Sequence, residues 1–433
     1  MKILLLLLIG SLSALSAADV VTTFDDGTTV KERFQTDSTG AKNGSYQSYY
    51  QTGKTHERGA YRKGKQDGSW TTLDEQGKTV LSERFSGGLL SGPFVKSHPN
   101  GRPWLKATYA KGELASPIRV FDADGQEVRE ITYPYSLDHL ATVMGTLMPA
   151  PLDTAALYAD PPSTKAPYAS GTLSPAGFDQ ALHTLQLFRF LAGAPWESLT
   201  VNPTTSATVQ KASTLLAIGG AFTHEPAKPA DMDNDFFTQG MDGINHSVMW
   251  QAGGDAGMVV SIQKWMEDPD VDCTHRRLLL NPSLTHVGFG FTAPFALTYI
   301  AEGIFDDVSG DPILYPGPGY FPQQFFTPTE AWLVLLKGTK SDLGSAHVQI
   351  TVNELDENYG VVSPVTVPDP RIITDTHFPT PAIVFRPQLT AINGKRFQVD
   401  ITLDSNGGGP DHISYMVDFE AVPLPANSPL PAK

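Results

Sequence analysis

Histidines, closely spaced carboxylates and one cysteine are the residues of this chain whose types could support chemistry. His224 and Glu225 begin like an H-E-x-x-H zinc-protease motif, but Pro226 follows and cannot continue the helix that this motif requires. The chain has no G-x-S-x-G sequence, which would mark a hydrolase nucleophile. Cys273 is the only cysteine, so no disulfide forms within the chain, and we interpret it as a half-buried small residue.

Two further patterns are weaker. Asp231, Asp233 and Asp235 alternate as in a calcium-binding loop. Phe236 stands at the sixth position, however, where such a loop needs glycine for its sharp turn. We therefore interpret this segment as a solvated acidic loop. Residues 317–319 (GPG) form a turn rather than a phosphate cradle, because no strand-loop-helix pattern surrounds them.

The charge of the chain limits its partners. Its 433 residues include 31 Lys and Arg and 46 Asp and Glu, which gives a formal net charge of −15. Nucleic acids and anionic membrane surfaces attract basic proteins. The partner classes that remain are a small ligand, an extracellular protein or a glycan.

The N-terminus has the order of a secretory signal peptide. Lys2 supplies a positive charge, residues 3–9 are apolar, and residues 13–18 are mostly small. The apolar run is shorter than the roughly 20 residues that span a bilayer, and no later stretch is apolar enough to do so. We predict a signal peptide over residues 1–18 and a secreted protein, extracellular or periplasmic, with no transmembrane segment.

A period of 24 residues runs through the next part of the chain. Glycines and large residues recur at this step in several registers: Gly53, Gly77, Gly101 and Gly125; Gly44, Gly68 and Gly92; Tyr46, Trp70, Phe94 and Ile118. In one unit, residues 68–73 alternate in the manner of a half-buried strand, residues 74–77 supply turn chemistry, and residues 82–85 form the return strand. Each unit is therefore predicted to be a β-hairpin that buries its aromatic face against neighbouring units.

The repeated pattern resembles a known repeat family. It reads G-x-[YW]-x-x-[YL]-x-x-x-G, followed by an aromatic residue and a glycine, and it is similar to the MORN-variant repeats of bacterial exported proteins. We assign the repeat region to residues 19–132. The resemblance implies an interaction or adhesive scaffold.

The composition changes near residue 133, and helices are predicted beyond it. Apolar residues at three- and four-residue steps place a stripe on a helix that starts after Ser174 and Pro175 and ends at Gly193. Two more helices are expected over about residues 207–219 and 255–266.

Separate segments of this central region carry a second resemblance. They are residues 188–195 (FRFLAGAP), 199–203 (LTVNP), 222–226 (FTHEP), 265–269 (WMEDP) and 275–290 (HRRLLLNPSLTHVGFG). In order and spacing they resemble the domains of the CAP/SCP superfamily of bacterial type. For residues 133–305 the resemblance implies that family's α-β-α sandwich, and the family consists chiefly of binding proteins.

The resemblance also implies a site. CAP domains usually gather two histidines and two acidic residues in a central cleft. His224 and His275 match the histidine positions, and Asp268 matches one acidic position, where Glu267 could serve instead. The other acid belongs to a G-E-N motif, but here Ile244 stands at its place.

Two kinds of chemistry are open to such a cleft. Imidazole and carboxylate groups suit zinc, with His224 and His275 as the metal ligands and His246 as a third nitrogen donor in place of the missing acid. The same groups could instead act as general acid and base. Either role requires the imidazoles of residues 224 and 275 to line one pocket.

We therefore expect a secreted binding protein rather than an enzyme. Its ligand-binding residues would be His224, His246, Glu267, Asp268 and His275, and zinc is the cofactor that they suit. The alternative is a metal-assisted or histidine-based esterase or peptidase with His224, Asp268 and His275 as its catalytic residues.

The C-terminal region, residues 306–433, is predicted to be all-β. Apolar and polar residues alternate over residues 348–352, 397–403 and 413–419, and Asn393-Gly394 supplies a hairpin-type turn. These patterns suggest a small β-sandwich. The expected fold class is thus α+β and multidomain, with an N-terminal β-hairpin repeat sheet, a central α-β-α sandwich and a C-terminal β-sandwich.

Overall fold

The computed structural model of the chain describes residues 18–148, 152–251, 257–300, 311–336, 347–357, 359–374, 380–404 and 412–423. The chain divides into two compact units, Met1–Tyr133 and Pro134–Lys433, and each is described by itself. All of the predicted signal peptide except Ala18 lies outside the described residues. Among the residues described, none of the helices combines the length and the apolar character needed to cross a membrane.

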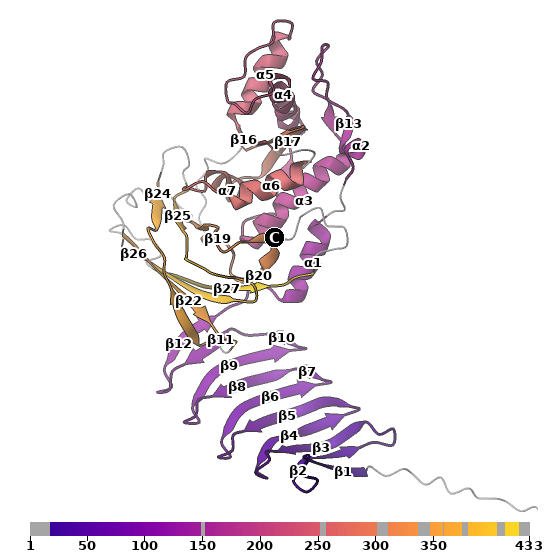
Figure 1. Cartoon of the computed structure of the whole chain (residues 1–433), viewed down its shortest axis with the longest axis vertical. Coiled ribbons are helices and arrows are strands. Elements are labelled where there is room, and N and C mark those ends of the chain that lie inside the picture. The colour runs from indigo at the N-terminus through magenta and orange to yellow at the C-terminus, as the bar shows by residue number, and fades with distance from the viewer. Residues whose placement is uncertain are drawn as a thin grey trace, which may run out of the picture. The chain divides into compact units, whose positions relative to one another are not determined.

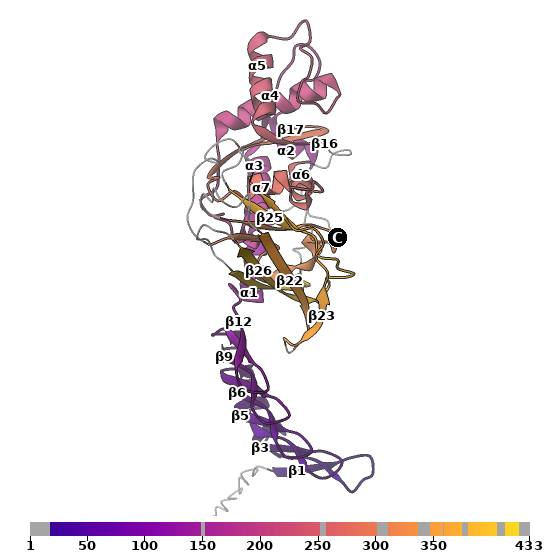
Figure 2. The same ribbon diagram turned by 90° about the vertical axis from the view of Figure 1, so that its left-hand side faces the viewer.

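The first unit is one antiparallel sheet of twelve strands. Its main strands pair in chain order, and β7 and β10 attach beside β6 and β9 (Figure 1). Turned by 90°, the same sheet is seen as a single layer (Figure 2). The strands are β1 (Ala18–Thr23), β2 (Val30–Thr36), β3 (Lys42–Tyr49), β4 (Thr55–Arg62), β5 (Lys65–Leu73), β6 (Thr79–Ser86), β7 (Leu89–Leu90), β8 (Gly92–Ser97), β9 (Pro103–Ala110), β10 (Glu113–Leu114), β11 (Ile118–Phe121) and β12 (Glu127–Ile131).

The 24-residue period corresponds to successive hairpin turns. Gly53, Gly77, Gly101 and Gly125 have φ values of 79°, 81°, 86° and 87°, which favour glycine. In each turn the glycine N–H donates to the carbonyl three residues earlier, as from Gly77 to Asp74 at 2.9 Å. The spacing of these glycines therefore repeats because the same turn closes one hairpin in each 24-residue unit.

An aromatic ladder supplies the apolar packing of this sheet. The ring of Trp70 lies 5.2 Å from those of Tyr46 and Tyr61 and 6.1 Å from that of Phe85, measured between centroids. Trp70 is only 4% exposed although the sheet has one layer. It lies directly over Gly59, where an added Cβ would come within 2.3 Å of the indole. A glycine opposite the tryptophan thus lets the ring lie flat on its neighbouring strand.

The second unit begins with helices and a small sheet. Its elements up to residue 299 are α1 (Leu137–Leu147), α2 (Thr154–Leu157), β13 (Tyr158–Asp160), β14 (Thr172–Leu173), α3 (Pro175–Leu191), β15 (Thr200–Val201), α4 (Pro203–Gly219), α5 (Asn234–Asn245), β16 (Ser247–Gln251), α6 (Gly257–Glu267), α7 (Thr274–Leu279), β17 (His286–Thr292) and β18 (Phe295–Tyr299). Side-chain caps fix the starts of α1 to α5; Ser174, for example, accepts a hydrogen bond from the N–H of Gly177 at the start of α3.

The sheet β15-β17-β18-β16 separates two apolar cores. Successive residues of β16 belong to different cores: Met249 packs with α4 and α5, whereas Val248 packs with α3, α6 and α7. Figure 1 shows these two sets of helices on either side of β16 and β17. The period-two alternation of a strand therefore distributes its side chains between the two cores.

The C-terminal strands form two more sheets, with orders β19-β21-β25-β24 and β20-β27-β26-β22-β23. Their elements are β19 (Ile313–Tyr315), β20 (Gly319–Pro322), the 3-10 helix η1 (Gln323–Phe325), β21 (Trp332–Leu335), β22 (His347–Leu355), β23 (Val361–Val365), β24 (Arg371–Ile373), β25 (Ala382–Phe385), β26 (Arg396–Asp404) and β27 (His412–Glu420). The ring of Trp332 lies 6.2 Å from the rings of Phe397 and Phe419, so the two sheets pack against each other.

The expected fold class is wrong. The described residues are mostly β, with 41% strand against 22% helix, and their largest sheet is the twelve-stranded antiparallel one. Within the part of the chain that the structure describes, no α-β-α sandwich stands as a separate domain, because one continuous core joins α3, α6 and α7 to the C-terminal strands. Phe188 of α3, for example, contacts Phe325 at 5.8 Å between ring centroids. Sequence periodicity identified the elements but not the long-range contacts that merge them.

Candidate functional site

Asp268 organises the turn between α6 and α7. It directly follows α6 and has a positive φ of 34°, which turns the chain sharply. Its side chain is fully buried: Oδ2 accepts a hydrogen bond from the N–H of Arg276 at 2.9 Å, and Oδ1 lies 3.3 Å from Nδ1 of His275. Asp268 therefore holds the start of α7 and orients the His275 ring at the same time.

A second carboxylate completes a three-residue group. Oδ2 of Asp270 lies 3.7 Å from Nδ1 of His275. One ligand atom each from Asp268, Asp270 and His275 can be chosen so that all lie within 4.8 Å of one another. The side chain of Asp270 is 57% exposed and that of His275 is 34% exposed. The group is therefore anchored on a buried carboxylate and open to solvent on the side of Asp270.

The charges of the group act on His275. Burial by itself disfavours the charged imidazole, but the hydrogen bond to the Asp268 carboxylate and the charges of Asp268 and Asp270 outweigh burial. The pKa of His275 is therefore raised above its ordinary value. The neighbouring Cys273 behaves differently, because burial raises the pKa of its thiol and keeps it protonated. A buried, neutral thiol is a poor nucleophile.

Arg276 fixes this region to the core. Its guanidinium donates to the carbonyl oxygens of Met266, Glu267 and Ala331 at 2.5, 2.7 and 2.6 Å, and it lies 4.7 Å from the ring centroid of Tyr315. These contacts join the end of α6 to the segment that precedes β21. The three-residue group thus rests on a rigid support, which a binding site requires.

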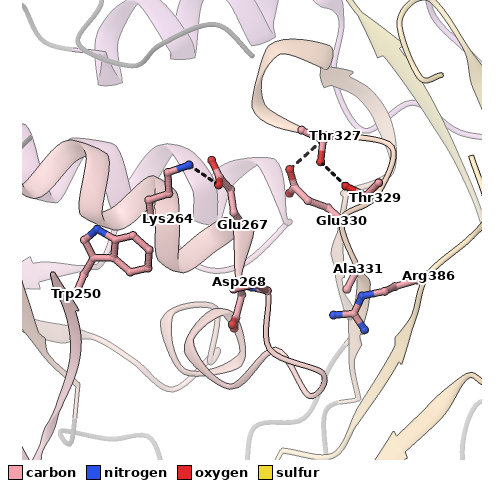
Figure 3. Close-up of a pocket in the computed structure, with 10 residues that line it drawn as sticks. Trp250, Lys264, Glu267, Asp268, Thr327, Thr329, Glu330, Ala331 and Arg386 are labelled. Atoms are coloured by element: carbon pink, nitrogen blue, oxygen red, sulfur yellow. Dashed lines mark hydrogen bonds and ion pairs between the residues drawn. The ribbon is translucent and has the colours of Figure 1, made fainter. Parts of the chain in front are cut away.

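A pocket of about 470 Å³ lies next to the group, and Asp268 lines it. Figure 3 shows Trp250, Lys264 and Glu267 on one side and the segment from Thr327 to Ala331 on the other. The ammonium of Lys264 lies 2.7 Å from a carboxylate oxygen of Glu267. The pocket therefore has a mixed polar and aromatic lining.

The structure brings together only some of the residues that the sequence suggested. Asp268 and His275 are in contact, and Glu267 lines the adjoining pocket. His224 is exposed in the chain segment after α4 and does not belong to the group around His275. His246 lies at the end of α5, where its Nδ1 is 3.0 Å from Asp242. Neither of these two histidines is part of the candidate metal group.

Other residues of interest have structural roles. Ile244, which stands where the resemblance expects an acid, is fully buried in the apolar core beside α4. Asp233 caps α5 by accepting hydrogen bonds from the N–H groups of Asp235 and Phe236, and Asp231 accepts one from the hydroxyl of Tyr168. These acidic residues fix local structure.

Asp270 was missed by the sequence reasoning. The resemblance directed attention to one acidic residue near position 268, whereas the alternation of Asp268 and Asp270 in the printed sequence was a visible signal for two. Arg386 and the segment 327–331, which form the far wall of the pocket, lie more than fifty residues away. Only the folded chain places them beside Asp268.

No protein-family model and no curated protein matches the chain. Solved structures similar to it include an extracellular SCP-domain protein from Bacillus anthracis, with 13% identity over 66% of this chain and 86% of that one and a TM-score of 0.22. A cysteine-rich secretory protein from Staphylococcus aureus has 14% identity over 66% and 89% of the two chains and a TM-score of 0.20.

Another similar structure is the S. aureus protein TarM, with 11% identity, a TM-score of 0.14 and coverage of 30% of this chain; the chain spans 24% of the length of that protein. Bacterial SCP-domain proteins are thus among the structural neighbours. The MORN resemblance of the repeat region stays a prediction.

Proposed function

We propose that this chain is a secreted binding protein that holds a divalent metal ion, zinc, through Asp268, Asp270 and His275. The observation that carries the proposal is the convergence of two carboxylates and one imidazole at the turn between α6 and α7. Oxygen and nitrogen donors of this kind are typical zinc ligands.

The spacing of the donors supports zinc. Two ligands of a tetrahedral zinc ion, each about 2.1 Å from the metal, lie about 3.4 Å apart. Nδ1 of His275 is 3.3 Å from Asp268 and 3.7 Å from Asp270. Asp270 is exposed and free to adjust, so only a small movement would bring all three donors to the metal.

We favour binding because one side of the group is open to a ligand and its neighbouring thiol is not an activated nucleophile. Zinc bound by three protein ligands keeps a fourth position for an atom of a partner or for water. The only cysteine, Cys273, is buried with a raised thiol pKa and supplies no nucleophile. The solvent-facing Asp270 instead leaves an accessible side for a ligand.

Isothermal titration of the mature full-length chain with zinc tests the proposal. Asp270→Asn and His275→Ala each remove a donor, and we expect each to weaken zinc binding by at least about tenfold. His246→Ala is the matched control, since that exposed histidine has a single carboxylate neighbour. Asp268→Asn is avoided as the main variant because its carboxylate also holds α7.

Three results would contradict the proposal. Unchanged zinc binding in both variants would show that these residues do not form the zinc site. A loss in His224→Ala equal to that in His275→Ala would favour the two-histidine site instead. Ester or peptide hydrolysis that depends on His275 would make the protein an enzyme.

A further inference from the structure

We infer that the pocket beside the proposed zinc site binds a neutral, hydroxyl-rich ligand of the mono- or disaccharide class. The pocket lies between the end of α6 and the segment Thr327–Ala331 (Figure 3). Its volume of about 470 Å³ falls in the usual range for small-molecule sites, about 300–1,000 Å³. The inference is independent of whether zinc binds.

Four of the five charged side chains that line the pocket have an oppositely charged partner within the protein, and the fifth, Arg386, donates to backbone carbonyl oxygens. Lys264 pairs with Glu267 at 2.7 Å. Glu330 accepts the N–H of Thr327 at 2.9 Å and lies 3.8 Å from the guanidinium of Arg276. A charged ligand would have to break such pairs in a partly desolvated site, which is costly. The lining therefore favours a ligand without net charge.

The remaining wall groups are suited to hydroxyls. Arg386 donates to the carbonyl oxygen of Asp270 at 2.9 Å, and its planar fork has five N–H donors in total. The hydroxyls of Thr327 and Thr329, 3.4 Å apart, can each donate and accept. Sugar hydroxyls also donate and accept, so they match a wall that carries carboxylates, hydroxyls and a guanidinium.

Trp250 supplies the apolar part of the site. It is half-buried in β16 and lines the same pocket, where Figure 3 shows its indole next to Lys264. An aromatic ring of this kind offers a large, rigid contact surface with a polar N–H at one edge. One face of a pyranose ring carries C–H groups that pack against such a surface, while its hydroxyls reach the polar wall.

Saturation-transfer NMR and titration calorimetry on the mature full-length chain provide the test. The probes are glucose, galactose, N-acetylglucosamine and their disaccharides, with glucuronate and glucosamine as charged counterparts that keep the pyranose ring. We expect saturable binding of at least one neutral sugar and at least about fivefold weaker binding of its charged counterpart.

Two variants locate the site. Thr329→Val removes one exposed hydroxyl at constant size and is expected to weaken binding about two- to tenfold. Trp250→Leu removes the ring and is expected to weaken binding about tenfold. Thr351→Val, at an exposed strand position, and Trp196→Leu, at another half-buried tryptophan, are the matched controls and should leave binding unchanged. Thr329→Val keeps the test decisive if Trp250→Leu does not fold.

The outcomes that would overturn the inference are distinct from those for zinc. Absence of saturable binding for every neutral sugar, equal binding of charged sugars, or equal loss in the controls would each refute it. The titration is repeated in EDTA. Binding that persists supports the pocket, whereas binding that disappears would assign the ligand to the metal and overturn the inference.

Discussion

The two units of this chain bury their large side chains by different means. In the sheet of Ala18–Ile131, Trp70 is covered by rings of neighbouring strands within one layer. In the second unit, Trp332 is fully buried in a core that joins helices and two sheets. The first arrangement depends on residues close in sequence, and the second on residues far apart. Contacts between neighbouring repeats are visible in the sequence as a 24-residue period, whereas contacts between distant segments produce no such pattern.

Arg189 illustrates the second arrangement. It is fully buried in α3, yet its guanidinium donates to the carbonyl oxygens of Pro195, Leu279, Asn281 and Leu284 at distances from 2.6 to 3.3 Å. Three of these acceptors lie some ninety residues away. One side chain thus satisfies backbone groups that would otherwise be unpaired inside the core.

The largest expected effect is therefore that of Arg189→Met. The substitution keeps an apolar stem but leaves several buried carbonyls unpaired, and we expect a loss of about 4 kcal/mol in the free energy of unfolding. Urea denaturation followed by fluorescence measures it. Arg371→Met, which removes an exposed pair with Asp272, should cost less than about 1 kcal/mol. Equal losses in the free energy of unfolding for the two variants would show that the buried guanidinium stabilises the fold no more than the exposed one does.

An intermediate effect is expected for Gly59→Ala in the repeat sheet. The added Cβ would meet the Trp70 indole, so we expect a loss of about 1–3 kcal/mol in the free energy of unfolding of that unit. In the background of Trp70→Ala the same change should cost much less, since the ring that it meets is gone. Calorimetry of all four chains measures this coupling.

Gly145→Ala is the control for that cycle. It lies in α1 with open space around its Cα, so alanine should be neutral or slightly stabilising there. An additive result at Gly59 and Trp70 would contradict the view that the ladder depends on this one close contact.

The smallest effect is the pH dependence at His275. Its pKa is raised in the folded protein, so the stabilisation is fully present below its unfolded value of about 6.5 and is lost as the pH rises through the folded value. His275→Gln should therefore lower the free energy of unfolding more at pH 5.5 than at pH 8.5, in metal-free buffer. His286→Gln, at an exposed strand end, is the matched control for the substitution itself. A larger loss in the free energy of unfolding at pH 8.5 than at pH 5.5 would contradict a raised pKa of His275.

The sequence predicted the local features best. The turn glycines and the start of α3 near Ser174 and Pro175 were readable because each depends on neighbours within a few residues. Of the site, Asp268 and His275 were named and do meet, but Asp270 was missed and His224 does not join them. The pocket wall formed by Arg386 could not be foreseen, because only long-range packing brings it to α6.

The regular turn of the repeat sheet makes its length adjustable in whole steps. Neighbouring strands lie about 4.8 Å apart, so each two-stranded repeat extends the sheet by about 9–10 Å. Duplication or deletion of one repeat would change the reach of this unit by that increment and leave each remaining side chain on its original face. A single inserted residue would instead invert the faces of a strand. Growth by whole hairpins is thus the mutational route that preserves the ladder.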